Sequence, residues 1–137
     1  MTTELRRQEL DRAEIVSGQV AVPFGRLAEQ VVSVVFHDML ASSEYGLLDQ
    51  NTFEPRSNYW AAVLWHRLMG STVLDAGLLE SQLHLYAHCV RGHPGGVTLL
   101  AINLSRTETK SLELPTSADR YTLSAPKLDD GLVELNG

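Results

Sequence analysis

Four carboxylates in the first half of the chain could carry acid–base or nucleophilic chemistry: Asp38, Glu44, Asp49 and Glu54. Glycosidic bonds are hydrolysed with retention by two carboxyl groups about 5–5.5 Å apart on either side of the sugar. These four residues form no recognisable pair, because they follow one another along a predicted strand end and loop. Asp49 and Glu54 fit the roles of holding turns and capping the helix that opens at Pro55. The residues alone therefore indicate no catalytic mechanism, although Asp38 and Glu44 lie where sites collect at strand ends.

The histidines and the cysteine predict no metal or cofactor site. His84 and His88 are four residues apart in a strand-like segment, too far apart to share a metal easily, and no Cys pair or carboxylate cluster accompanies them. They are predicted to be one or two histidines on the surface of the sandwich. Cys89 lies on an apolar strand and is predicted to be a buried structural thiol. The glycine pair at 95–96 reads as a hairpin turn rather than a phosphate-binding loop. His37 differs from the others, because it lies at a predicted strand end and could face a site.

The composition is that of one globular domain. The chain has 137 residues, of which 44% are hydrophobic and 20% are charged. The net charge is −6 and no block of Lys and Arg stands out, which disfavours a nucleic-acid partner. The single cysteine excludes an internal disulfide bond.

The N-terminal sequence and the apolar runs bear on localisation. Residues 1–10 contain no apolar stretch of the kind that a secretory signal requires, so the chain as written is predicted to be cytoplasmic. The longest apolar runs, Val31 to Phe36 and Val97 to Ile102, are far too short to span a bilayer.

Residues 1–71 divide into two parts. Residues 1–30 form a lead-in, of which residues 3–14 are predicted to be a short surface helix. Residues 31–71 begin with a β-branched run, typical of a strand that is buried on both faces. A polar loop follows, and then a helix over Pro55 to Met69, which Gly70 is expected to end. Tyr59, Val63 and Trp65 on the apolar face of that helix are expected to pack against the second half of the chain.

The pattern of apolar, polar and turn residues in residues 72–137 is typical of a partial antiparallel β-sandwich. Apolar and polar residues alternate from Leu83 to Cys89, and Val97 to Leu104 reads as a second strand. The turn residues 93–96 between them predict a hairpin with a connection of four or five residues. Further short strands are predicted around Leu112, around Tyr121 to Leu123 and from Leu132 to Leu135.

Two stretches resemble the heparanase-like enzymes of glycoside hydrolase family 79. They are Tyr45-Gly-Leu-Leu-Asp through Trp60, and Leu64-Trp-His-Arg-Leu-Met-Gly-Ser-Thr-Val-Leu. Leu83-His-Leu-Tyr-Ala-His-Cys and Gly96-Val-Thr-Leu-Leu-Ala-Ile-Asn-Leu-Ser are similar to paired strands of the family's C-terminal β-sandwich. The resemblance runs from about Val31 to the end of the chain.

The resemblance implies an α+β fragment: a remnant of a (β/α)8 barrel, with one strand and one helix, followed by the partial sandwich. It implies a glucuronide-containing glycan as ligand, for which the predicted binding residues are Tyr45, His37 and Glu44. Tyr45 corresponds to a tyrosine that contacts the uronic acid carboxylate. His37 stands where the family often has glutamine, and Phe36 where it has arginine. The strands that carry the two catalytic glutamates have no counterpart, so no residue of this chain is predicted to be catalytic.

Two interpretations of the sequence therefore remain. The chain is either the C-terminal part of a retaining β-glucuronidase of a commonly secreted family, or a non-catalytic carbohydrate-binding or interaction module. Open sheet edges and an uncovered helix face would favour self-association or pairing with a complementing chain.

Overall fold

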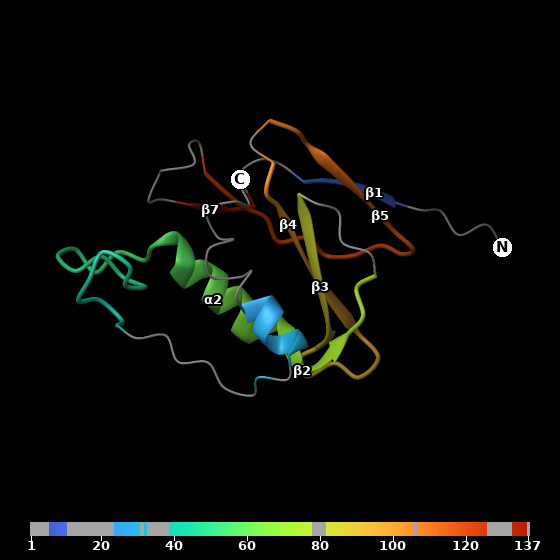
Figure 1. Ribbon diagram of the computed structural model, residues 1–137, viewed down its shortest axis with the longest axis horizontal. Helices are drawn as coiled ribbons and strands as arrows, with labels where there is room; N and C mark the ends of the chain where they lie inside the picture. Colours follow the sequence, from blue (N-terminus) through green and yellow to red (C-terminus); the bar gives the residue numbers. More distant parts are fainter. Residues whose placement is uncertain are drawn as a thin grey trace.

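The computed structural model describes residues 6–10, 24–30, 32, 39–77, 82–105, 107–125 and 133–136. A short helical segment covers residues 24–29, and the other elements are one helix and seven strands (Figure 1). In chain order these are β1 (Arg6–Leu10), α2 (Ser57–Leu68), β2 (Met69–Leu74), β3 (Leu83–Val90), β4 (Val97–Asn103), β5 (Lys110–Leu114), β6 (Leu123–Ser124) and β7 (Glu134–Leu135).

The centre of the fold is an antiparallel sheet with the strand order β2-β3-β4. The β3–β4 hairpin pairs Leu83 with Asn103 and Cys89 with Val97, as the alternation in the sequence predicts. Its connection spans residues 91–96, slightly longer than expected, and Gly95 adopts a φ of 82° there. Such a positive φ favours glycine over residues that carry a Cβ.

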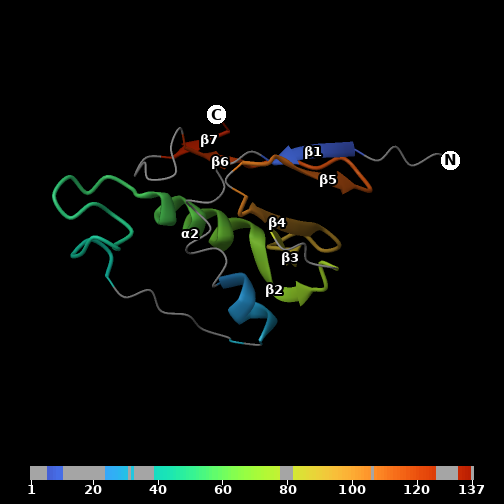
Figure 2. The ribbon, with the colours of Figure 1, turned by 45° about the horizontal axis from the view of Figure 1, so that its top comes forward.

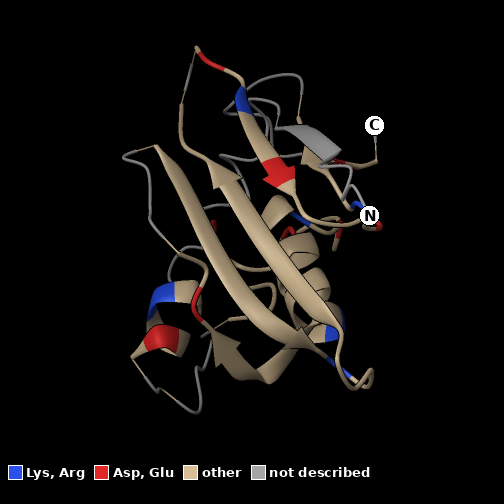
Figure 3. Ribbon diagram, turned by 90° about the vertical axis from the view of Figure 1, so that its right-hand side faces the viewer, with Lys and Arg blue, Asp and Glu red and all other residues tan. Residues whose placement is uncertain are grey.

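Helix α2 runs into strand β2 without a connecting loop (Figures 1 and 3). The predicted helix is confirmed, but its predicted end at Gly70 is wrong, since Met69 is already extended with φ −79° and ψ 117°. Gly70 lies inside β2, where a Cβ would collide with the backbone carbonyl of Cys89. This glycine is therefore needed for the close approach of β2 to β3 rather than for a helix stop.

Three consecutive carbonyl groups at this junction accept hydrogen bonds from the hairpin. Leu68 O accepts from the Arg91 backbone N–H at 3.0 Å and from Thr98 Oγ1 at 3.1 Å. Met69 O accepts from Arg91 Nη2 at 3.1 Å, and Gly70 O contacts His88 Nδ1 at 2.7 Å. The Leu68 carbonyl, at the end of α2, is thus satisfied by the hairpin turn and β4 instead of by water, and the carbonyls of Met69 and Gly70 continue these contacts along β2.

The hydrophobic core lies between α2 and one face of the sheet. Met69, Tyr86 and Ile102 form its buried cluster, and Trp65 of α2 packs against them. The helical segment 24–29 extends this layer, since the Phe24 and Trp65 ring centroids are 5.6 Å apart (Figure 2). The face that α2 covers carries His88, which is 3% exposed and whose ring lies edge-on to Trp65 at 5.2 Å. Sequence alternation had favoured the opposite face of β3 as the apolar one, and it had placed His88 at the surface.

Strand β1 corrects the prediction for the N-terminal region. Residues 6–10, inside the helix predicted over residues 3–14, form an antiparallel pair with β5. A short helix of weak amphipathicity has little stability of its own, whereas pairing with β5 satisfies a row of backbone groups. Strands β6 and β7, both predicted, pair with each other and complete the strands of the second half.

The barrel remnant stays a prediction. Within the predicted barrel strand, Val31 to Ala41, the structure describes residues 32 and 39–41, and none of these is in a strand. His37 and Asp38 lie outside the described residues. The described residues form a small α+β arrangement of two helical segments and antiparallel sheets, in which no helix is long and apolar enough to cross a membrane.

Replacing Trp65 tests the docking of α2. Because Trp65 contacts the core but stays partly exposed, we expect Trp65→Ala to cost about 2–3 kcal/mol, at or below the lower end for large-to-small aromatic substitutions. His66→Ala, at the next and exposed position, should change stability by less than about 0.5 kcal/mol. Urea titration of both variants measures the difference. A loss below about 1 kcal/mol for Trp65→Ala would mean that the helix is not docked on the sheet.

Candidate functional site

Two of the three predicted binding residues, Glu44 and Tyr45, belong to a loop of residues 39–56 at the N-terminal end of α2, whereas His37 lies outside the described residues. Backbone hydrogen bonds close this loop, from Leu48 N to Leu40 O at 2.8 Å and from Arg56 N to Leu47 O at 3.0 Å. Leu48 and Pro55 form an antiparallel bridge. The loop therefore has its own internal pairing, and Figure 1 shows it at the end of α2 away from β2.

Asp49 organises the turn in the middle of this loop. Its carboxylate accepts hydrogen bonds from the backbone N–H groups of Asn51 at 2.8 Å and Thr52 at 3.0 Å, and from Arg56 Nη2 at 3.2 Å. The Thr52 and Asn51 amides, with a smaller contribution from Arg56, lower the pKa of Asp49 to about 2. The predicted turn-holding role of Asp49 is confirmed. Its predicted helix-capping role is wrong, since α2 begins after Arg56 with no side-chain cap.

Tyr45 and Glu44 lie on the outside of the loop. Tyr45 is 62% exposed and Glu44 is also exposed. The Asn58 side-chain amide of α2 donates to the backbone carbonyls of Tyr45 and Gly46, both at 3.3 Å. Asn58 thus ties this part of the loop to the helix, a role that sequence reasoning missed. The structure places Glu44 and Tyr45 at one open surface, whereas their proximity to His37 is not described.

The loop also exposes large apolar side chains to solvent. Leu40 is 60% exposed and Phe53 is 63% exposed, values close to that of Tyr45. Phe53 has a φ of 58°, uncommon for a residue with a side chain, and its N–H donates to Asp49 O. The Asp49 turn therefore holds a strained backbone that presents an aromatic ring to solvent.

A hollow of about 310 Å³ lies beside this loop, along α2. Leu47 lines it from the loop, and the helix contributes Tyr59, Ala62, Val63, His66 and Arg67. Trp65 packs on the sheet as the sequence predicts, whereas Tyr59 and Val63 line this open hollow. One side of α2 is thus covered by the core and another side is left apolar and accessible.

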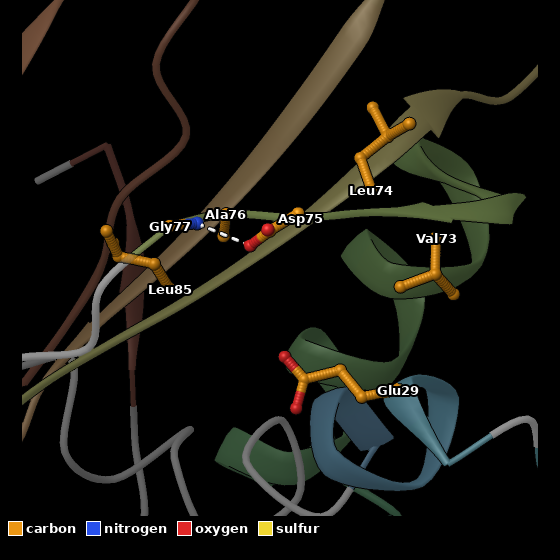
Figure 4. A pocket seen from close by; sticks show the side chains of 7 residues that line it. All are labelled: Glu29, Val73, Leu74, Asp75, Ala76, Gly77 and Leu85. Carbon is orange, nitrogen blue, oxygen red and sulfur yellow. Dashed lines mark hydrogen bonds between the residues drawn. The ribbon is translucent and has the colours of Figure 1, made fainter.

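A second hollow, of about 420 Å³, lies where β2 ends beside β3 (Figure 4). Two carboxylates line it, Glu29 from the helical segment and Asp75 after β2. The Asp75 carboxylate accepts from Gly77 N at 2.9 Å, so it is already engaged in a local turn. Sequence reasoning did not single out either residue, and neither lies in the loop of residues 39–56.

The pKa values of a buried tyrosine, Tyr86, and its neighbour His84 differ from the usual values of these groups. Tyr86 is 3% exposed and its hydroxyl lies 3.4 Å from His84 Nδ1. Burial raises the pKa of Tyr86, against a smaller opposing effect of the Arg26 guanidinium. Burial, helped by Arg26, lowers the pKa of His84. Across the described residues, no group of three His, Cys, Asp or Glu side chains could hold a metal ion.

Comparisons with known proteins identify relatives of one kind. No family model matches the chain. It is 37% identical over 131 residues to heparanase of Bos taurus, covering 82% of this chain and 24% of that protein. It is 35% identical over 138 residues to inactive heparanase-2 of Homo sapiens, covering 82% of this chain and 23% of that protein. A baicalin β-D-glucuronidase of Scutellaria baicalensis is 35% identical over 106 residues, covering 72% of this chain and 20% of that protein.

The chain is therefore homologous, over most of its own length, to the heparanase-like glycoside hydrolases and β-glucuronidases. It spans about a fifth to a quarter of the length of these curated relatives. The resemblance stated from the residues is confirmed.

Removing the Asp49 carboxylate should make the stability of the protein less dependent on pH in acidic solution. A carboxylate whose folded-state pKa lies below its unfolded value of 3.8 stabilises the fold above that value and loses this contribution as the pH falls toward about 2. Asp49→Asn should therefore lose less stability than the wild type between about pH 4 and pH 2. Thermal midpoints measured across that range give the comparison.

The matched control is Glu44→Gln, which removes one charge from the same loop. No hydrogen bond described for this loop involves the Glu44 carboxylate. Between about pH 4 and pH 2, the stability of Glu44→Gln should change with pH as that of the wild type does, and less like that of Asp49→Asn. An identical dependence of stability on pH in all three proteins would contradict the role assigned to Asp49.

Proposed function

We propose that the chain is the C-terminal portion of a heparanase-like retaining β-glucuronidase and that it is not catalytic on its own. The observation that carries this proposal is the asymmetry of the homology. The matches cover 72–82% of this chain but 20–24% of the relatives. A polypeptide of this extent supplies one part of the structure of such a protein, and the loop with Tyr45 is the part of it that faces ligand.

Two of the described carboxylates already have hydrogen-bond partners within the fold. Asp49 is held as an anion by two backbone N–H groups and Arg56, and Asp75 is engaged by Gly77. Glu44 is exposed on the outside of its loop. The chain is also nearly equally similar to a heparanase and to a protein named inactive heparanase-2. Similarity over this portion is therefore found both to a protein named heparanase and to one named inactive, so it does not by itself favour activity.

The proposed ligand is a glucuronide-containing glycan, bound through Tyr45, His37 and Glu44. A phenol hydroxyl that donates to a uronic acid carboxylate makes a charge-assisted hydrogen bond. Tyr45 is 62% exposed, so its hydroxyl is accessible to a sugar acid, and Asn58 fixes its backbone. These features support a recognition role for the residue without any bond-breaking step.

A second candidate function is a carbohydrate-binding or interaction module, and the exposed apolar residues favour it. Leu40, Tyr45 and Phe53 are each at least 60% exposed within one loop. Such residues gather where a protein meets a partner or a sugar ring. Light scattering separates assembly from glycan binding, because a monomer at all concentrations excludes obligate self-association.

The absence of independent catalysis is directly measurable. We expect the purified chain to release no aglycone from an aryl β-glucuronide above the buffer rate. Glu44→Gln is the informative variant, because Glu44 is the exposed carboxylate next to Tyr45. Turnover by the wild type that this substitution abolishes would show a working carboxylate and would overturn the proposal.

Ligand recognition has a separate test in Tyr45→Phe, which removes one hydroxyl and keeps the ring. We expect glucuronic acid to shift NMR signals of residues 44–46, with binding weakened about three- to tenfold in the variant. Glucose is the matched control, since it lacks the carboxylate and should bind wild type and variant alike. Equal affinity of both proteins for glucuronic acid would remove Tyr45 from the site.

A further inference from the structure

The helical segment that precedes α2 lies against α2 and β3 through contacts of three consecutive residues. Its Phe24 ring packs on the ring of Trp65, with the two centroids 5.6 Å apart. Gly25 lies directly on the Tyr86 ring, where a Cβ would overlap with the ring atoms. Arg26 acts on the Tyr86 hydroxyl as a hydrogen-bond donor and as a positive charge. Tyr86 is thus the residue of the sheet on which the segment is docked.

A histidine completes this contact. His84 lies two residues before Tyr86 on the same face of β3, and its Nδ1 atom is 3.4 Å from the Tyr86 hydroxyl oxygen. A guanidinium group only donates hydrogen bonds, so the Tyr86 oxygen accepts from Arg26 and its proton is left for His84. A neutral imidazole accepts that hydrogen bond, whereas an imidazolium cannot, because both of its nitrogens carry protons. The chain from Arg26 through Tyr86 to His84 is therefore complete only while His84 is neutral.

The surroundings of His84 oppose its protonation. Burial lowers the pKa of His84, and the charge of Arg26 lowers it further, against a smaller opposing effect of Glu29. Both charged residues belong to the helical segment. On the sheet, Ile102 of β4 is the register partner of His84, and His88 on the same face of β3 is bonded to β2. A proton on His84 would thus place a second cation beside Arg26 and break the hydrogen bond from the tyrosine.

The direction of the pH effect follows from the lowered pKa of His84. Once the segment has left, the ring regains water and its pKa returns toward the ordinary value of 6.5, so the proton is held more tightly in the released state. Docking is therefore fully favourable above pH 6.5 and weakens as the pH falls below that value toward the lower pKa of the docked state. Histidine is the side chain that ordinarily changes its charge in this range.

We propose that the helical segment 24–29 is a pH-sensitive element, docked on β3 while His84 is neutral and released when His84 is protonated. Release uncovers the Tyr86 ring and withdraws Glu29 from the hollow of about 420 Å³ beside β2 (Figure 4). The sheet itself is kept, because β3 pairs with β2 and β4 through its own backbone. The inference depends on this cluster of side chains and is independent of the proposed function.

An NMR titration of the full chain from about pH 7.5 to about pH 5 tests the proposal. We expect the backbone signals of residues 25–29 to lose their helical chemical shifts in step with the titration of the His84 ring, at a midpoint below pH 6.5. The signals of the β3–β4 hairpin should keep their strand shifts over the same range. Helical shifts of the segment that survive at about pH 5, or hairpin signals lost in the same step, would overturn the proposal.

His84→Gln assigns the change to this residue, because glutamine offers an acceptor to the Tyr86 hydroxyl and does not gain a charge. In this variant we expect the segment to stay docked down to about pH 5. His93→Gln is the matched control, since His93 is exposed in the hairpin turn, and it should release the segment at the same pH as the wild type. Release that persists in His84→Gln, or that disappears in His93→Gln, would contradict the inference.

Discussion

The structure depends on the junction at which α2 becomes β2. Three successive carbonyls, those of Leu68, Met69 and Gly70, accept hydrogen bonds from the β3–β4 hairpin. The Leu68 carbonyl belongs to the end of α2, and those of Met69 and Gly70 belong to the start of β2. All three are bonded to the hairpin, so the helix cannot turn relative to the sheet without breaking several hydrogen bonds. Gly70 makes this approach possible, because any side chain at that position would meet the Cys89 carbonyl.

This constraint connects the sheet to the loop that carries the proposed ligand contacts. Trp65 anchors the last turns of α2 to the core, and Asn58 in the first turn anchors the backbone at Tyr45 and Gly46. The loop closes on itself through the Asp49 turn. The exposed ring of Tyr45 is therefore presented by a support that is fixed at both ends of the helix. A recognition surface needs such a fixed backbone more than it needs burial of its contact residues.

Sequence patterns predicted the elements in which local chemistry and periodicity agree. The helix over residues 57–68 and the hairpin of β3 and β4 follow from helical spacing, from alternation and from the turn residues 93–96. The helix end was mispredicted because glycine has two uses: Gly70 permits close strand contact rather than a left-handed stop. Strand β1 was mispredicted because its structure comes from pairing with β5, more than a hundred residues away along the chain. No local pattern in residues 3–14 carries that information.

The candidate site was predicted in the same uneven way. The residue types of the turn at Asp49 were enough to predict its structural role, whereas Asn58 acts on a backbone twelve or thirteen residues away and gave no signal. The role of Tyr45 as a ligand contact and the lack of a catalytic carboxylate pair stay proposals. The two proposals are compatible, since recognition and bond cleavage use different groups.

The most direct test of this account is native-state hydrogen exchange measured at increasing denaturant concentration. If the junction makes one cooperative unit of helix and sheet, the amides of Trp65 in α2 and of Tyr86 in β3 should exchange with the same free energy of opening and the same dependence on denaturant. Exchange of the α2 amides through a separate opening of much lower free energy, with β3 still protected, would show that the helix is held independently and would contradict the account.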